Sequence, residues 1–182
     1  MEKRALNKDR EWHITKLKGN NAENIIWSLI TSMPDWKCIK FGVENHIKDL
    51  RDVVKEHFNP ITKKIKSMPD FVAFNTKTGE THFIEVKYRK RTINFKTNKP
   101  EYHINFLEEY RDNWVGTKLI VLEDCEPYLF IVDLDNITDN MSKKVKDYGS
   151  FWNFEETKKG IKDIFPELKD ETIQRVISKE DG

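Results

Sequence analysis

Three residues with the chemistry to act on a phosphate group lie close together in the sequence. Asp70 follows Pro69 and begins an apolar run, and Glu85 and Lys87 stand two positions apart in the next apolar run. The segment between the runs, Asn75 to Glu80, contains a Thr-Gly pair typical of a tight turn, so the two runs predict a β-hairpin. Because side chains alternate along a strand, Glu85 and Lys87 share one face of the predicted sheet, and Asp70 can reach that face from the partner strand.

Two carboxylates at such a position form a hard, oxygen-rich site of the kind that Mg²⁺ prefers. We expect Asp70 and Glu85 to bind the metal, with the backbone carbonyl of Val86 as a further ligand and Mn²⁺ as a substitute for Mg²⁺. The metal would neutralise a phosphate group and lower the pKa of its bound water. Lys87 is placed to orient the attacking water and to stabilise the charge that develops on the phosphate. The pattern therefore predicts metal-dependent hydrolysis of a phosphodiester.

A carboxylate two residues before a lysine is a weak signal by itself. Four such triplets occur in the chain: Asp35-Lys37, Glu85-Lys87, Glu156-Lys158 and Glu167-Lys169. The triplet at Glu85 is the one that lies in an apolar strand following a Pro-Asp strand through a turn, which is the context the chemistry needs. The structural alternative is an exposed strand edge on which Glu85 and Lys87 are ordinary surface residues.

Hydrophobic periodicity along the chain predicts the elements that position these residues. The predicted elements, in chain order, are a helix over Ala22–Ser32, a strand over Trp36–Phe41, a helix over Asn45–Phe58, strands over Phe71–Phe74 and His82–Arg89, a helix over Glu101–Trp114, and strands over Lys118–Leu122 and Tyr128–Leu134. Beyond Asn140 the sequence predicts short helices or irregular segments, whose aromatic residues provide packing material. Strands linked by helices, with a hairpin on the same sheet, imply an α/β fold with a mixed sheet.

Residues 19 to 135 resemble the core of the PD-(D/E)xK nuclease superfamily, on the Pro-Asp70 and Glu85-Val-Lys87 motifs and on the element order. The resemblance implies a restriction-endonuclease-like core, a central mixed sheet flanked by helices (αβββαβ), with Asp70, Glu85 and Lys87 at the catalytic positions. The segment Lys18-Gly-Asn-Asn-Ala-Glu23 also resembles the opening of the archaeal Holliday junction resolvases. That similarity makes Glu23 a fourth catalytic candidate, which would support a second metal or its water. Without the resemblance, Glu23 is an acidic residue favoured by the helix dipole in a first helical turn.

The sequence departs from the resolvase pattern in three places. The insert 43–66 is longer than the corresponding segment of compact resolvases, and the helix after Lys87 offers His103 and Asn105 in place of the glutamine of many relatives. About forty residues follow the core, so we expect a nuclease core over 1–140 and an extension over 141–182 that packs on it. A restriction-type, mobile-element or phage nuclease is therefore an alternative to a Holliday junction resolvase-like, structure-specific enzyme. A catalytically silent nucleic-acid-binding module of the same fold is another.

Charge is segregated along the chain, although the formal net charge is only +1. The run from Lys87 to Lys99 holds six basic residues and no acidic one, with aromatic residues interleaved. Such a run suits phosphate contacts and base stacking, and a solvated loop is the structural alternative. The residues expected to contact nucleic acid are Arg89, Lys90, Arg91, Lys96, Lys99, Lys63 and Lys64. We expect DNA as the partner and a homodimer by analogy, because cutting both strands needs two sites.

The remaining sequence features limit the other classes of function. Cys38 and Cys125 are expected to be reduced core thiols, and the five histidines lack the spacing of a zinc site. The chain has no glycine-rich phosphate loop and no nucleophile elbow. The charged segment Met1–Lys18 does not resemble a signal peptide, and the apolar runs are too short to span a bilayer. We therefore expect a soluble, cytoplasmic protein that does not enter a membrane.

Overall fold

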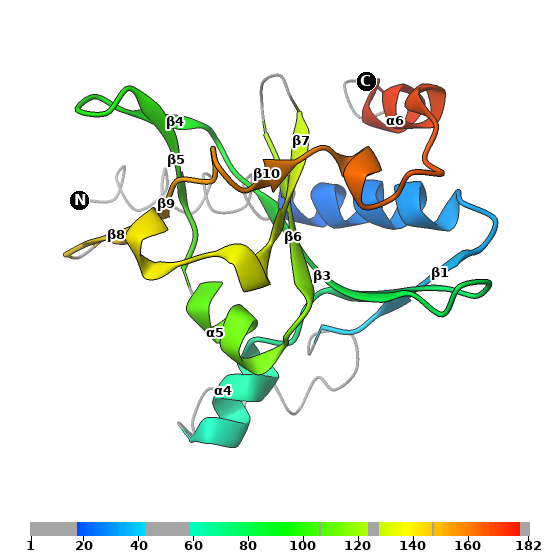
Figure 1. Cartoon of the computed structure of the whole chain (residues 1–182), viewed down its shortest axis with the longest axis horizontal. Coiled ribbons are helices and arrows are strands. Elements are labelled where there is room, and N and C mark those ends of the chain that lie inside the picture. The colour runs from blue at the N-terminus through cyan, green and yellow to red at the C-terminus, as the bar shows by residue number, and fades with distance from the viewer. Residues whose placement is uncertain (1–17, 43–58, 106, 124–127, 147, 179–182) are drawn as a thin grey trace, which may run out of the picture.

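The computed structural model describes residues 18–42, 59–105, 107–123, 128–146 and 148–178. Its centre is a mixed six-stranded sheet with helices on its faces, so the predicted α/β class with a mixed sheet is confirmed (Figure 1). The strands, in their order across the sheet, are β1 (Trp36–Lys40), β2 (Phe71–Asn75), β3 (Thr81–Tyr88), β6 (Thr117–Leu122), β7 (Leu129–Asp133) and β10 (Lys158–Lys159). β3 and β6 pair in parallel, and the other neighbouring strands of this sheet pair antiparallel.

The predicted hairpin is formed by β2 and β3. The side chain of Asn75 closes its turn, accepting hydrogen bonds from the backbone N–H groups of Lys77 (2.9 Å) and Thr78 (3.0 Å). Gly79 follows with a φ of 78°, a left-handed conformation that glycine adopts without steric cost. The register pairs Phe71 with Ile84, and this register sets which residues of the two strands face each other.

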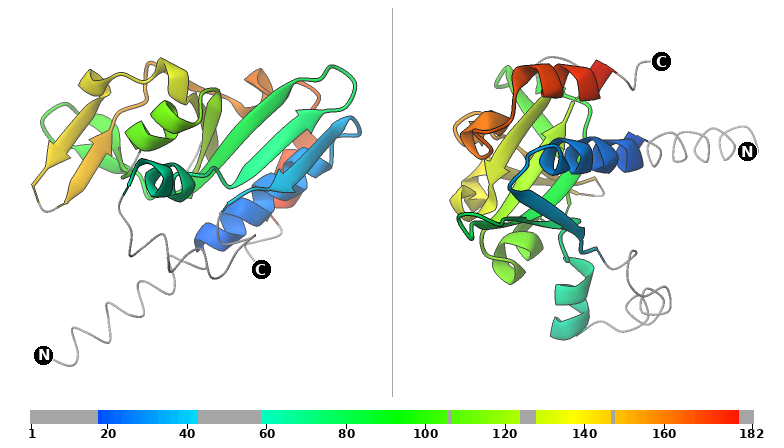
Figure 2. Two further views of the ribbon diagram at one scale, coloured as in Figure 1. Left: turned by 90° about the horizontal axis from the view of Figure 1, so that it is seen from below. Right: turned by 90° about the vertical axis from the view of Figure 1, so that its right-hand side faces the viewer.

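One face of the large sheet is covered by the helix over residues 18–31 and by the C-terminal segment that ends in α6 (Asp170–Ser178). The views in Figure 2 show both helices on the same side of the sheet. The predicted helix over Ala22–Ser32 is confirmed, but the chain is already helical at residue 18. Ile26, Leu29 and Ile30 are fully buried from the helix, because their spacing places them on one stripe that packs on the sheet.

The opposite face is covered by α5 (Leu107–Asn113) and by a second, four-stranded sheet. The strands of this second sheet, in their order across it, are β4 (Thr92–Asn94), β5 (Lys99–His103), β9 (Gly149–Trp152) and β8 (Ser142–Val145). A second apolar core, which includes Tyr102, Trp152 and Phe154, lies between the two sheets. The large sheet therefore separates two cores.

The second sheet overturns two of our predictions. The helix predicted over Glu101–Trp114 is wrong in its first half, because Lys99–His103 form β5 and the helix is limited to Leu107–Asn113. The prediction of short helices or irregular structure beyond Asn140 is wrong for Ser142–Val145 and Gly149–Trp152, which form β8 and β9. Tyr102 pairs with Trp152 across β5 and β9, so contacts between distant segments outweigh the local helical pattern.

The remaining described elements are short. α4 (Pro60–Lys66) begins at the N-cap Asn59, whose side chain accepts hydrogen bonds from the N–H groups of Ile61 (2.9 Å) and Thr62 (3.0 Å). The 3-10 helices are η1 (Leu134–Asn136), η2 (Asp139–Met141) and η3 (Ile161–Asp163). The predicted helix over Asn45–Phe58, most of the insert 43–66 and Cys125 lie outside the described residues. Among the described helices, none has the length and apolar content needed to cross a membrane.

Candidate functional site

Asp70 is fixed immediately before β2 by contacts from two neighbouring strands. Its carbonyl oxygen accepts hydrogen bonds from the N–H groups of Phe41 (2.8 Å) and Gly42 (3.3 Å), which follow β1. Its carboxylate Oδ2 accepts a hydrogen bond of 2.8 Å from the N–H group of Val86 in β3. Extending the Phe71–Ile84 register by one residue places Asp70 opposite Glu85, and both residues are buried. The two carboxylates therefore lie side by side at the start of β2, where β3 extends beyond the end of its partner strand.

Lys87 lies on the same face as Glu85, as the alternation of side chains along β3 predicts. Its Nζ atom forms an ion pair with Oε1 of Glu85 and lies 5.7 Å from the centre of the Tyr110 ring in α5. Burial lowers the pKa of Lys87, but the carboxylates of Glu85 and Asp70 together outweigh burial and raise the pKa above its ordinary value. Lys87 is therefore held as a cation among two anions, with 23% of its side chain still exposed.

Arg89 continues the row of Glu85 and Lys87 along β3. Its Nε atom donates to the carbonyl of His103 (2.6 Å), and its Nη1 atom donates to the carbonyl of Tyr88 (2.7 Å). Burial lowers the pKa of the Arg89 guanidinium, against the opposing effect of the nearby Glu85 carboxylate. Arg89 was expected to contact nucleic acid, and the structure places it beside the carboxylate site and ties it to β5.

Glu23 lies on the opposite side of the sheet from Lys87. Its helix packs on the face of β3 that carries Val86 and Tyr88. Contacts of residues before and after Glu23 show where this helix lies. Lys18 donates a hydrogen bond of 3.2 Å to the Tyr88 hydroxyl, and the centre of the Trp27 ring lies 5.7 Å from that of the Phe71 ring. The structure thus brings Asp70, Glu85 and Lys87 together, and it places the half-buried Glu23 on the helix that covers the other face.

The donor chemistry of the site suits a hard divalent ion. In the part of the chain that the structure describes, no three His, Cys, Asp or Glu side chains are grouped closely enough to hold a metal by themselves. Mg²⁺ commonly binds through one or two carboxylates and fills its remaining positions with water and substrate phosphates. Asp70 and Glu85, with the Val86 carbonyl as a further candidate ligand, fit this mode of binding.

Arg91 is paired with a buried carboxylate from another segment of the chain. Its guanidinium forms two hydrogen bonds with the buried carboxylate of Glu123, of 2.9 Å from Nε and 2.8 Å from Nη2. The hydroxyl of Tyr102 donates a third hydrogen bond of 2.9 Å to the same carboxylate, and burial raises the pKa of this hydroxyl. The basic run has no acidic residue of its own, but Glu123 neutralises Arg91 from another segment. Lys90, Lys96 and Lys99 are exposed.

The two lysines of α4 that were expected to bind nucleic acid lie beside α5. Lys64 is placed over the ring of Trp114, with its Nζ atom 5.4 Å from the ring centre. Lys63 lines a hollow of about 520 Å³ together with Glu108, Glu109 and Asp112. These acidic side chains reduce the attraction of this surface for a phosphate backbone.

Two features of the site region were missed by sequence reasoning. Tyr110 contacts Lys87 from α5, and although a helix was predicted there, no local signal in the sequence places this ring beside Lys87. Exposed lysines of the β8–β9 hairpin stand on the same sheet as the basic run, and no local pattern in the sequence predicted these strands. They are Lys143, Lys144 and Lys146.

Comparison with known proteins finds no family model that matches this chain and no similar curated protein.

Proposed function

We propose that this chain is a Mg²⁺-dependent endodeoxyribonuclease of the PD-(D/E)xK type, with Asp70, Glu85 and Lys87 as its catalytic residues. The observation that carries the proposal is the meeting of two buried carboxylates and one charged ammonium group where β3 extends past β2. A purely structural ion pair would need one carboxylate for Lys87. Two carboxylates close together also supply the oxygen ligands through which Mg²⁺ commonly binds.

The order of elements supports a restriction-endonuclease-like core. The helix over residues 18–31 is followed along the chain by β1, β2, β3, α5 and β6. This order is the αβββαβ order of the superfamily, and the parallel pairing of β3 with β6 joins the two halves into one mixed sheet. α4 and the β4–β5 hairpin are additions to that core.

In the proposed reaction, Asp70 and Glu85 hold the metal, and the Val86 N–H group keeps the Asp70 carboxylate in place. The bound ion would supply positive charge at the phosphate and a more acidic water. Lys87 orients the attacking water and stabilises the negative charge that develops on the phosphate oxygens. The cation is available for this role because the neighbouring carboxylates raise its pKa. Arg89 adds a second fixed positive charge immediately after the same strand.

Glu23 is proposed to support a second metal or its water, although its helix covers the other face of the sheet. A homodimer is proposed because a single site of this kind cuts one strand at a time. Both proposals rest on the resemblance to the superfamily.

The experiment that tests the proposal is cleavage of a labelled substrate panel with Mg²⁺, with Mn²⁺ and with EDTA. The panel contains a four-way junction, a flap, a linear duplex, a single strand and a plasmid. Glu85→Gln removes the charge of one metal ligand, and Glu167→Gln is the matched control in an exposed Glu-x-Lys triplet. We expect metal-dependent cutting by the wild type and by Glu167→Gln, and none by Glu85→Gln. DNA binding without cutting by the wild type would favour the silent binding module instead.

A further inference from the structure

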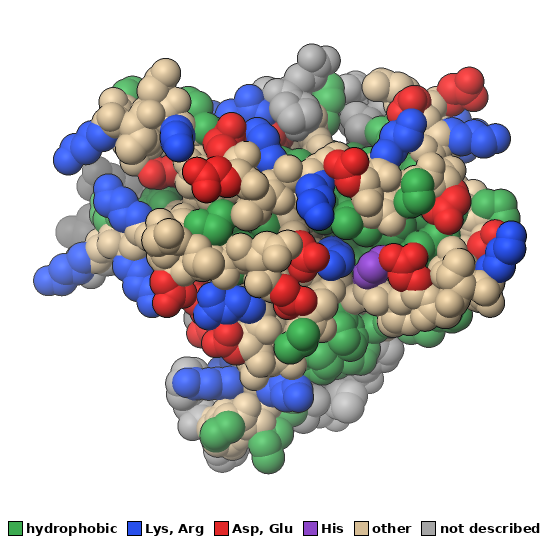
Figure 3. Space-filling model, viewed as in Figure 1, with side chains coloured by type: hydrophobic (Ala, Val, Ile, Leu, Met, Phe, Trp, Pro, Cys, Tyr) green, Lys and Arg blue, Asp and Glu red, His purple; other side chains and the backbone are tan. Residues whose placement is uncertain are grey.

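Positive charge is concentrated on the second sheet, although the chain as a whole is nearly neutral. Residues 92–103 and 142–152 contain five lysines and two acidic residues, whereas the net charge of the chain is +1. Lys96, Lys99, Lys143 and Lys146 are exposed on its two hairpins. Lysine and arginine side chains project along the left edge of Figure 3, where these hairpins lie. A local field of this sign attracts a polyanion such as a nucleic acid.

Two rings lie on the solvent side of this sheet. The pairing of β5, β9 and β8 aligns His103, Phe151 and Lys143 in one row across three strands. The neighbouring residues Tyr102 and Trp152 point into the core, so alternation turns His103 and Phe151 outward. The two rings are 5.1 Å apart between their centres and inclined by 32°. Flat aromatic groups between lysines form a surface on which bases can stack.

A hollow of about 280 Å³ lies next to this row. Phe151, Lys99 and Lys143 contribute to its lining, together with the amide side chains of Asn140 and Asn153. Its carboxylates, which belong to Glu101 and Glu156, cannot bind phosphate but can accept hydrogen bonds from the amino groups of bases. The hollow thus combines an aromatic face, hydrogen-bonding groups for a base edge and cations for the backbone.

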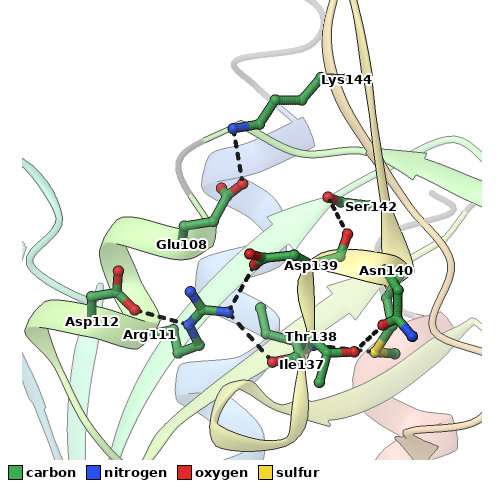
Figure 4. Close-up of polar contacts among 10 residues, drawn as sticks. Glu108, Arg111, Asp112, Ile137, Thr138, Asp139, Asn140, Ser142 and Lys144 are labelled. Atoms are coloured by element: carbon green, nitrogen blue, oxygen red, sulfur yellow. Dashed lines mark hydrogen bonds and ion pairs between the residues drawn. The ribbon is translucent and has the colours of Figure 1, made fainter.

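The second sheet is fixed relative to the catalytic strand. β3 leads directly into β4, and Arg89 donates a hydrogen bond to the carbonyl of His103 in β5. α5 contacts the β8–β9 hairpin and the η2 turn that precedes it. Figure 4 shows these contacts: Glu108 of α5 forms an ion pair with Lys144 of β8 (3.7 Å), and Arg111 of α5 forms one with Asp139 of η2 (3.4 Å). A strand bound on the second sheet would therefore keep a defined position relative to Lys87.

We propose that the outer face of the second sheet, centred on Phe151, Lys99 and Lys143, binds an unpaired DNA strand. It would direct the enzyme to DNA that carries such a strand, such as a flap, a fork or an overhang. In a duplex the base faces are already stacked, so a duplex offers this surface its phosphates but not its bases. The selection of a cleavage substrate rests on the proposed nuclease function, whereas the binding surface is tested independently of cleavage.

The test is fluorescence anisotropy with a labelled oligothymidylate of about twelve nucleotides, in EDTA so that no metal-dependent cutting occurs. Phe151→Leu removes the ring and keeps an apolar side chain. Lys99→Ala/Lys143→Ala removes two charges from the lining of the hollow. Lys37→Ala/Lys77→Ala removes two exposed lysines from β1 and the β2–β3 turn and is the matched control. Thermal melting of each variant verifies the fold.

We expect Phe151→Leu to raise the Kd for the oligonucleotide about fivefold or more and to leave binding of a blunt duplex unchanged. Lys99→Ala/Lys143→Ala should lower the slope of log affinity against log salt by about 1.4, because two phosphate contacts are lost. The control variant should keep the wild-type Kd for the oligonucleotide within about twofold.

Wild-type affinity in both Phe151→Leu and Lys99→Ala/Lys143→Ala would overturn the inference, whether or not the chain cuts DNA. Binding confined to oligouridylate would overturn the assignment to DNA in favour of RNA. If the wild type cuts no substrate in Mg²⁺ but oligothymidylate binding responds to these variants as expected, the nuclease proposal fails and the binding surface stands.

Discussion

The ammonium group of Lys87 lies between a carboxylate, Glu85, and the ring of Tyr110, and both contacts favour its charged form. At the residue scale, the adjacency of Asp70, Glu85 and Lys87 was predictable, because it follows from the two-residue period of a strand and from a short turn. The partner of Arg91 was not predictable, because Glu123 is 32 positions away and nothing local connects the two residues. The structure gives Arg91 a buried acidic partner, and its expected contact with nucleic acid stays a prediction.

The first prediction concerns the role of Lys87. Lys87→Ala is expected to lower the single-turnover rate of metal-dependent cleavage by about 10²- to 10³-fold, because it removes the cation nearest the developing charge. Lys169→Ala, in the exposed Glu167-Lys169 triplet, is the control and should cut at the wild-type rate. An unchanged cleavage rate in Lys87→Ala would exclude Lys87 from the reaction.

The second prediction concerns His82, whose ring stacks on Trp36 with 5.7 Å between ring centres. Burial lowers the pKa of His82 below the ordinary value of 6.5, against the opposing effect of Glu80. As pH falls, His82 therefore takes up a proton in the unfolded state before it does so in the folded state. The contribution of His82 to stability is fully present above its ordinary pKa, and it is lost as pH falls through the lowered pKa of the folded state.

His82→Phe keeps the stacking and removes the titration. The melting temperature of the wild type, relative to that of His82→Phe, is expected to drop between about pH 7.5 and about pH 5. A constant difference between the two melting temperatures over this range would show that His82 does not titrate on unfolding.

At the element scale, the strands that carry the candidate catalytic residues could be predicted and the second sheet could not. β2 alternates buried and half-buried residues, β3 alternates apolar and charged residues in its sequence from Ile84 to Tyr88, and a short turn joins them, so each signal lies within a few residues. β5 and β9 depend on each other: Tyr102 pairs with Trp152, and the indole N–H of Trp152 donates to the carbonyl of Ile104 (2.9 Å). Roughly fifty residues separate these partners in the chain, so a local pattern cannot show the contact.

The third prediction concerns the attachment of the β4–β5 hairpin. Glu123→Gln is expected to lower the free energy of unfolding by about 2 kcal/mol, because Arg91 loses its charged partner inside the protein. Asp170→Asn breaks the surface pair between Lys162 and Asp170 and should cost less than about 0.5 kcal/mol. Urea denaturation of the two variants measures the contrast, and equal losses would contradict the structural role of Glu123.

At the scale of the whole molecule, one sheet separates two cores and brings the two surfaces of interest onto one side. Glu85, Lys87 and Arg89 lie on the face of β3 that is shared with α5 and the second sheet. The C-terminal segment contributes to both cores, through Phe165 and Leu168 on one side and Trp152 and Phe154 on the other. The predicted extension over 141–182 is thus integrated with the core.

The most direct test of the central claim is the single-turnover cleavage rate of Asp70→Asn as a function of Mg²⁺ concentration. The side-chain oxygen of asparagine can still accept the hydrogen bond from the Val86 N–H group, so the link between residue 70 and β3 is preserved. The metal loses a charged ligand. We predict that Asp70→Asn remains folded and that its cleavage rate falls by about 10²-fold or more at every Mg²⁺ concentration. A variant with the wild-type rate and the wild-type dependence on Mg²⁺ would contradict the assignment of Asp70, Glu85 and Lys87 as one metal-dependent catalytic site.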